Sequence, residues 1–184
     1  MLSYKKDLSS FNYFIRAEES IGNEVPMGKK SAPVLGDTLP AKQEKNEMRQ
    51  EKILKRRAEY YFQRSEGVIK TRREDGLSLA ARDLFYFKDE VYLVLSLENR
   101  SGITFEPNYL KVYLTRGNKK RNSSYQRILK EPVYTYNFPS DVLDLQQRKF
   151  VLVFSKFTVG KNENIELEMR EKKGNRYLKM RFRP

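Results

Sequence analysis

The sequence contains neither cysteine nor histidine among its 184 residues. Without cysteine there are no disulfides and no thiolate nucleophiles, and without histidine there are no Ser-His or Cys-His catalytic pairs. The same two absences exclude zinc and iron sites of the usual His/Cys kind. Most familiar enzyme chemistries therefore lack the residues that would carry them, and we expect no cofactor and no bound metal.

Long hydrophobic runs are missing as well. A transmembrane helix needs about 20 mostly apolar residues, whereas no uninterrupted apolar run in this chain exceeds the five residues of the stretch 150–154. A secretory signal needs an apolar stretch of about 7–15 residues, but Met1 is followed by Ser3, Lys5, Lys6 and Asp7. We therefore expect no membrane-spanning segment and no signal peptide in this chain, which is either cytoplasmic or a trimmed piece of an exported protein.

Positive charge is abundant, with 37 Lys and Arg residues against 24 Asp and Glu, a formal net charge of +13. Basic residues gather at 52–57 and again at Lys119, Lys120 and Arg121, after the turn Gly117-Asn118. One interpretation is nucleic-acid binding, because neutralised phosphates release counterions and nearby tyrosines such as Tyr134 and Tyr136 could stack on bases. The other is a solvated helix face and a charged hairpin tip, which we favour because net charge concerns solubility and partners before it concerns a groove.

The chain divides into three zones. Residues 1–40 lack a sustained period and are rich in Pro and Gly, which predicts a flexible linker or the remnant of a missing N-terminal domain. Residues 41–66 are rich in Glu, Lys, Arg and Gln, and predict a charged helix. Leu54, Ala58, Tyr61 and Phe62 recur at helical spacing, so only the second half of this helix has an apolar stripe.

From residue 67 to 184 the hydrophobic period changes to two. Alternating apolar residues occur in runs at 91–97, 110–114, 150–154, 165–169 and 178–182. Turn sequences such as Arg116-Gly117-Asn118 and Lys173-Gly174-Asn175 separate them. Short strands with tight turns are typical of a mainly β fold, an antiparallel β-sandwich or barrel-like domain, here preceded by one α-helix. The inward residues of these runs are expected to form one core: Leu93, Leu95, Leu97, Val112, Leu152, Phe154, Leu167 and Leu178.

Carboxylates are the remaining candidates for catalysis, since a glycosidase needs only two of them. Glu163, Glu166, Glu168 and Glu171 lie close in sequence. Glu166 and Glu168 alternate with apolar residues, which predicts that they line the solvent face of a strand, as in an ordinary half-buried sheet. A carboxylate-based hydrolase is therefore the least favoured hypothesis, and we expect a protein that is not an enzyme.

Two polar segments are more informative. Asn99-Arg100-Ser101-Gly102-Ile103 closes the strongest predicted strand with side chains that bond their own backbone in turns. Arg176 follows the turn Gly174-Asn175 and can be interpreted as a cation at the rim of the sheet beside Tyr177.

Taken in order, five segments resemble the C-terminal domain of the TraN proteins of conjugative transposons. They are Asn99-Arg100-Ser101-Gly102-Ile103 for the family's N-x-S-x-I, the basic hairpin Lys119-Lys120-Arg121 with the following Gln126, Pro132-Val133-Tyr134, Phe154-Ser155-Lys156-Phe157-Thr158-Val159, and Glu171-Lys172-Lys173-Gly174-Asn175-Arg176-Tyr177-Leu178 for E-K-x-G-G-R-x-L. Asn175 replaces the second Gly of the last motif, and Asn tolerates a left-handed turn position. The resemblance covers the linker, the helix and the C-terminal domain.

The resemblance implies a non-enzymatic structural or assembly subunit of a conjugative DNA-transfer apparatus of the type IV secretion kind. Its implied location is the periplasm, in association with an outer-membrane complex, and its implied partners are other conjugative transfer proteins rather than a small-molecule substrate. A basic nucleic-acid-binding module is the alternative. The residues expected to contact a partner are Asn99, Arg100, Ser101, Lys119, Lys120, Arg121 and Arg176.

Overall fold

The computed structural model describes residues 39–117 and 125–184, with side chains from residue 46 onward. Within the unit Leu39–Pro184, one helix precedes nine strands: α1 (Leu39–Arg64), β1 (Lys70–Glu74), β2 (Leu77–Phe87), β3 (Glu90–Asn99), β4 (Pro107–Arg116), β5 (Gln126–Lys130), β6 (Tyr134–Tyr136), β7 (Gln147–Ser155), β8 (Glu163–Glu171) and β9 (Tyr177–Phe182). The predicted linker lies almost wholly outside the described residues, as do Lys119, Lys120 and Arg121. No helix in the described part of the chain has the length and hydropathy of a membrane span.

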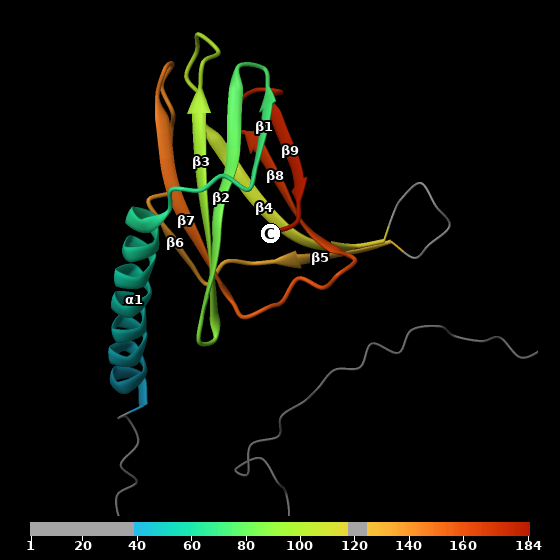
Figure 1. The fold of residues 1–184 in the computed structure, drawn as a ribbon. Coiled ribbons are helices and arrows are strands. Elements are labelled where there is room, and N and C mark those ends of the chain that lie inside the picture. Colours follow the sequence, from blue (N-terminus) through green and yellow to red (C-terminus); the bar gives the residue numbers. More distant parts are fainter. Residues whose placement is uncertain (1–38, 118–124) are drawn as a thin grey trace, which may run out of the picture. The chain divides into compact units, whose positions relative to one another are not determined.

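The nine strands form two antiparallel sheets (Figure 1). One has five strands in the order β1-β2-β3-β7-β6, and the other has four in the order β5-β4-β8-β9. The chain passes from the first sheet to the second after β3 and returns after β5. The predicted mainly β, antiparallel sandwich-like domain with one preceding helix is confirmed.

The main core lies between the two sheets, where the inward members of the alternating runs meet. Leu93 pairs with Leu152 and Leu95 with Phe150 across β3 and β7, and Val112 pairs with Leu167 across β4 and β8. All eight residues of the predicted core belong to this single cluster, so that prediction is confirmed. Burying a side chain such as Leu95 contributes about 1.5–3 kcal/mol, which makes this cluster the main source of stability.

Helix α1 covers the opposite face of the five-stranded sheet. The predicted stripe of Leu54, Ala58, Tyr61 and Phe62 packs there in a second cluster. The sheet side of this cluster comprises Phe85, Tyr92, Val94, Tyr134, Tyr136, Val151 and Val153. Residues 46–53 of the helix are exposed, as their lack of an apolar stripe predicts. The five-stranded sheet is therefore buried on both faces where the helix crosses it.

Polar contacts fix the helix on the sheet. The Arg57 guanidinium donates to both carboxylate oxygens of Glu90, at 2.6 and 2.9 Å, and Tyr92 Oη donates to the same carboxylate at 2.7 Å. At the end of the helix Ser65 Oγ donates to Asp83 Oδ2 at 2.6 Å. The helix begins and ends two residues earlier than the predicted 41–66.

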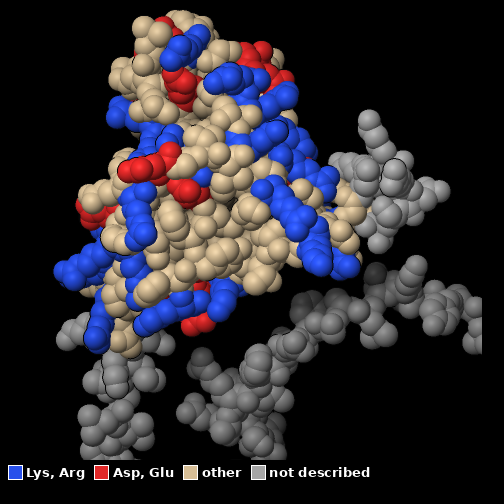
Figure 2. All heavy atoms as spheres, viewed as in Figure 1, with Lys and Arg blue, Asp and Glu red and all other residues tan. Residues whose placement is uncertain are grey.

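Positive charge is spread over more than one part of the surface. Figure 2 shows Lys and Arg side chains over α1 and along the side where β1 and β9 lie, with an area free of charged side chains between them over the lower half of β2. On this face, at least, the cations do not line one continuous groove.

Candidate functional site

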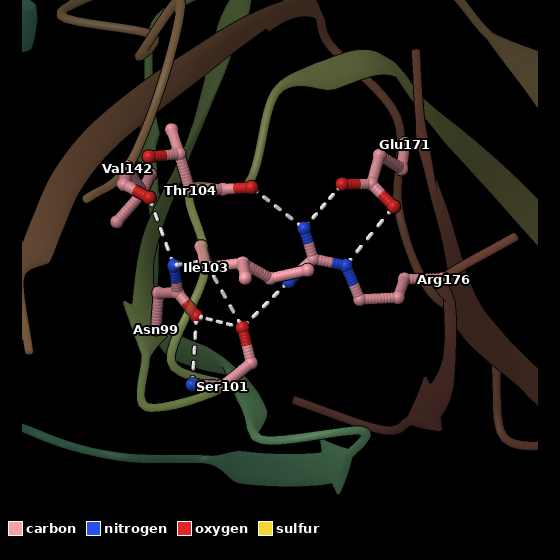
Figure 3. Close-up of polar contacts among 7 residues, drawn as sticks. All are labelled: Asn99, Ser101, Ile103, Thr104, Val142, Glu171 and Arg176. Carbon is pink, nitrogen blue, oxygen red and sulfur yellow. Dashed lines mark hydrogen bonds and ion pairs between the residues drawn. The ribbon is translucent and has the colours of Figure 1, made fainter. Parts of the chain in front are cut away.

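Two connections far apart in sequence meet at one end of the sandwich, and Arg176 joins them (Figure 3). Its guanidinium donates to Ser101 Oγ at 2.6 Å and to the Thr104 carbonyl at 2.7 Å, both in the connection from β3 to β4. It also pairs with both carboxylate oxygens of Glu171 at the end of β8, one of them at 2.9 Å from Nε. Its side chain is 12% exposed and that of Glu171 is 11% exposed. Arg176 therefore ties the connection that leaves the five-stranded sheet to the β8–β9 hairpin of the other sheet.

Asn99 holds the first of these connections in shape. The residue is fully buried, and its amide nitrogen donates to the carbonyls of Ile103 and Val142 at 2.7 and 2.9 Å. Its amide oxygen accepts from Ser101 twice, from the backbone N–H at 3.0 Å and from Oγ at 2.7 Å. Only a side chain with both donors and an acceptor can satisfy this arrangement. We call the set Asn99, Ser101, Glu171 and Arg176 the polar joint.

Two glycines leave the space that the polar joint needs. Gly76 has φ +73°, and a Cβ there would lie 2.7 Å from the Cα of Ser101. At Gly174 a Cβ would lie 2.6 Å from Cδ of Glu171, whose carboxylate cannot move aside because Arg176 holds it. The hydrogen bonds from Arg176 also lower the pKa of the Glu171 carboxyl. The glutamate thus stays charged and fixed against the turn.

Exposed apolar side chains stand next to the polar joint. Ile103 is 63% exposed, Leu143 46% and Leu145 79%. They lie in neighbouring connections, because the Gly102 N–H donates to Asp144 Oδ1 at 2.9 Å. Leu145 has φ +62°, an uncommon conformation for a residue with a side chain. We call Ile103, Leu143 and Leu145 the apolar tip, a surface that the polar joint holds in place.

The comparisons with known proteins identify the family of this domain. The model of a family described as "Domain of unknown function (DUF4138)" matches residues 51–183. The chain belongs to the DUF4138 family. No curated protein and no solved structure gives a significant match. The matched region begins within α1 and contains all nine strands, the polar joint and the apolar tip.

A second charged group lies on the outer face of the four-stranded sheet of the DUF4138 domain. Arg127 of β5 pairs with Glu166 at 2.8 Å and Glu168 at 2.5 Å, and its guanidinium carbon lies 3.4 Å from the ring centre of Tyr113. Lys179 of β9 approaches the same carboxylates, at 3.1 and 2.7 Å. The expectation that Glu166 and Glu168 point to solvent is wrong in part: they lie on the outer face, but Glu166 is only 4% exposed because Arg127 of β5 and Lys179 of β9 cover it.

The ionisation of this group follows from its contacts. Burial acts to raise the pKa of Glu168, but hydrogen bonds from Arg127, Lys179 and Tyr177 outweigh it and hold the pKa at about 2. Burial and the bond to Glu168 raise the pKa of Tyr177 to about 12. Hydrogen bonds to both glutamates raise the pKa of Lys179. Glu168 and Lys179 are thus held in their ionised forms, which suits a structural network better than proton transfer.

The structure brings three of the seven expected partner-binding residues together. Asn99, Ser101 and Arg176 lie in the polar joint, where their polar groups bond to the domain itself. Arg100 points outward, 70% exposed, and pairs with Glu98 at 2.6 Å. Lys119, Lys120 and Arg121 lie outside the described residues. The interpretation of Arg176 as a rim cation is wrong, since its side chain is largely buried.

The structure also bears on the predicted base-stacking tyrosines and on the conformation of Asn175. Tyr134 and Tyr136 pack against α1, with Tyr136 edge-on to Phe62 at 5.6 Å, so the helix covers the two tyrosines that a nucleic-acid interface would use for stacking. Asn175 does not adopt a left-handed conformation. The sequence offers no motif for Leu145 or Arg127. In the sequence, Glu171 is recognisable only as one of the clustered carboxylates and as the first residue of the segment 171–178, and not as the partner of Arg176.

Proposed function

We propose that this DUF4138 domain is a non-enzymatic assembly module that works through protein–protein contacts. Following the resemblance to TraN proteins, its setting is the DNA-transfer apparatus of a conjugative transposon, a system of the type IV secretion kind. The domain would work in the periplasm, associated with an outer-membrane complex, with other transfer proteins as its partners.

The observation that carries this proposal is the apolar tip beside the polar joint. Exposed apolar side chains that are grouped together mark interaction sites more often than isolated ones do. Here Ile103 and Leu145 stand on connections that buried hydrogen bonds hold rigid, so a partner would meet a preformed surface. Preformed surfaces lose less conformational entropy on binding.

The carboxylates support a structural role as well. A general acid in a hydrolase needs a pKa raised toward the working pH, whereas the pKa values of Glu168 and Glu171 are lowered by their cationic partners. Each of these carboxylates is already paired with a basic side chain. This favours a stable scaffold over an acid–base centre.

The test is crosslinking and co-purification from donor cells that carry the full-length protein. Ile103→Asp with Leu145→Asp should reduce recovery of other transfer proteins at least tenfold, since buried charges oppose apolar docking. The matched control is Val68→Asp, at an exposed valine in the connection after α1. Unchanged recovery with the tip variant, in a domain that still folds, would remove the support that the tip gives to an assembly role.

Nucleic-acid binding is the second candidate, favoured by the cations of two adjoining edge strands. Lys70, Arg72 and Arg73 of β1 lie beside β9, which contributes Lys179 and Arg181. A protein that contacts 6–10 phosphates loses about 10³ to 10⁵ in affinity between 50 and 200 mM salt. Submicromolar binding to duplex or single-stranded DNA at 150 mM salt, with such a slope, would favour this candidate.

The basic segment after Gly117 offers a second way to distinguish the two candidates. Joint replacement of Lys119, Lys120 and Arg121 by Gln should weaken partner recovery and leave DNA affinity unchanged if the domain is an assembly module. In a nucleic-acid-binding module the same change should instead flatten the salt slope by about one unit for each lost phosphate contact.

A further inference from the structure

A groove runs between the second half of α1 and the outer face of β2. It has a volume of about 560 Å³ and is lined by the helix residues Arg56, Arg57, Tyr60 and Arg64 and by the strand residues Phe85 and Phe87. This volume is within the range of pockets that take small ligands or the side chains of a peptide, about 300–1,000 Å³. The groove lies on a different part of the domain from the apolar tip.

The walls of the groove are aromatic and partly open. Tyr61 stacks on Phe85 with ring centres 4.6 Å apart, which closes the base between helix and strand. Tyr60 and Phe87 remain exposed beside them, at 53% and 38%. Exposed aromatic faces around a hollow favour an apolar or aromatic side chain as the occupant.

The charges of the groove are of one sign and only partly compensated. Glu90 neutralises Arg57, and no carboxylate lines the groove itself. Among the residues that the structure describes, the single hydrogen-bond partner of Arg64 is the neutral Tyr60 Oη, at 2.6 Å. Arg56 has no hydrogen-bond or ion-pair partner among the described side chains. Two guanidinium groups are therefore available to carboxylates of a bound molecule.

The edge of β2 beside the groove favours an extended peptide over other anions. β1 pairs with β2 only from Leu77 to Ala81, and in the described part of the chain no strand pairs with that edge from residue 82 to 87. Free strand edges are bound by extended peptides, which add main-chain hydrogen bonds to the sheet. A nucleic acid would use the two arginines but not the edge, and it normally needs a longer row of cations.

We propose that the α1–β2 groove binds an extended acidic segment of a partner protein, with an aromatic or aliphatic side chain between Tyr60 and Phe87. Flanking carboxylates of that segment pair with Arg56 and Arg64. This site does not depend on the assembly function proposed above, because the same recognition would serve any acidic partner.

The test uses fluorescence anisotropy with the full chain and a short labelled peptide of alternating Glu and Phe. Arg56→Gln with Arg64→Gln should weaken binding roughly threefold to thirtyfold, as expected for two exposed ion pairs. The control Lys70→Gln with Arg73→Gln removes the same charge from β1 and should leave affinity unchanged. A peptide of alternating Gln and Phe should bind the wild type and the groove variant equally.

Crosslinking locates the peptide independently of affinity. A photoreactive phenylalanine analogue at Tyr60 should capture the Glu-Phe peptide, and the same analogue at Met48, exposed on the first half of the helix, should not. The proposal is overturned by undetectable peptide binding, by equal loss in the β1 control, or by capture at Met48 alone. Tighter binding of oligothymidylate with the same dependence on Arg56 and Arg64 would assign the groove to nucleic acid instead.

Discussion

Two kinds of arginine can be compared in this domain: some pair with carboxylates of the fold, and others border an open groove. Arg176 and Arg127 lie among carboxylates that belong to the fold, and the rings of Phe105 and Tyr113 lie beside them. Arg56 and Arg64 border an open groove and have no carboxylate partner among the described residues. A net charge of +13 therefore says little about function, because it does not distinguish cations that are paired within the fold from cations that are open to a ligand.

The largest expected difference between the two kinds of arginine is in stability. Arg176→Ala removes one partner of a largely buried pair and leaves Glu171 charged and unpaired, which should lower the free energy of unfolding by about 3–5 kcal/mol. Arg100→Ala is the matched control, because that arginine is exposed, and should change stability by no more than about 0.5 kcal/mol. Urea unfolding measures both, and equal effects would break the comparison.

The loss of stability on truncating a core residue gives a reference value for the stability contribution of the polar joint. Leu95→Ala truncates a fully buried side chain and should cost about 2–5 kcal/mol, including the cavity that remains. If the loss for Arg176→Ala lies well below this value in the same urea series, the joint contributes little to folding. An unchanged melting midpoint for Leu95→Ala would contradict its place in the core.

The pH dependence of stability should differ between arginines that pair with buried carboxylates and arginines that do not. The pKa of Glu168 is about 2 in the folded state against 4.5 for the free side chain, so its contribution is present above pH 4.5 and is lost as pH falls toward 2. That contribution is on the order of 3 kcal/mol. Arg127→Gln should flatten the decline of stability between pH 5 and 2, measured by urea unfolding at each pH. Arg56→Gln should leave the decline unchanged, and an equally flattened profile there would contradict the assignment.

The smallest expected effect belongs to the groove. Arg56→Gln with Arg64→Gln should change the free energy of unfolding by less than about 0.5 kcal/mol, because neither side chain has a charged partner within residues 46–117 and 125–184. Thermal and urea unfolding check this directly. A loss of several kcal/mol would mean that these arginines stabilise the helix on the sheet, as Arg57 does, and are not held ready for a ligand.

The sequence predicted the core well because apolar residues occupy every second position throughout the predicted runs that build it. Every inward residue of the runs at 91–97 and 150–154 could be assigned from the period of two. β2 was not among the predicted runs, because its alternation is interrupted at the bulge between Ala81 and Asp83. β1, β5 and β6 were not predicted either, since Lys70–Glu74 has no apolar alternation and the other two strands are short. Their pairing depends on the neighbouring strands more than on their own residues.

The polar joint and the charged face were beyond the reach of local patterns. Ser101 and Arg176 are 75 residues apart in sequence, and each looked like an ordinary turn residue. The alternation correctly placed Glu166 on the outer face of β8. It could not indicate that Arg127, from β5 on the far side of β4, and Lys179, from the adjacent β9, would cover that carboxylate.

The double burial of β3 has a consequence for how the chain finds its correct strand alignment. Val91, Leu93 and Leu95 face the main core, while Tyr92 and Val94 face the helix, so a slip of one residue would still place apolar side chains on both faces. The hydrophobic pattern of a strand normally fixes its alignment, because a slip of one residue exposes apolar side chains to water. In β3 the free-energy cost of such a slip is small. The two ends of β3 must select the alignment instead, because Glu90 contacts Arg57 of the helix and Asn99 contacts the Val142 carbonyl only in the native alignment. A domain without Asn99 would therefore lose more than a few hydrogen bonds, because β3 could settle into misaligned pairings with β2 and β7 that the native chain excludes.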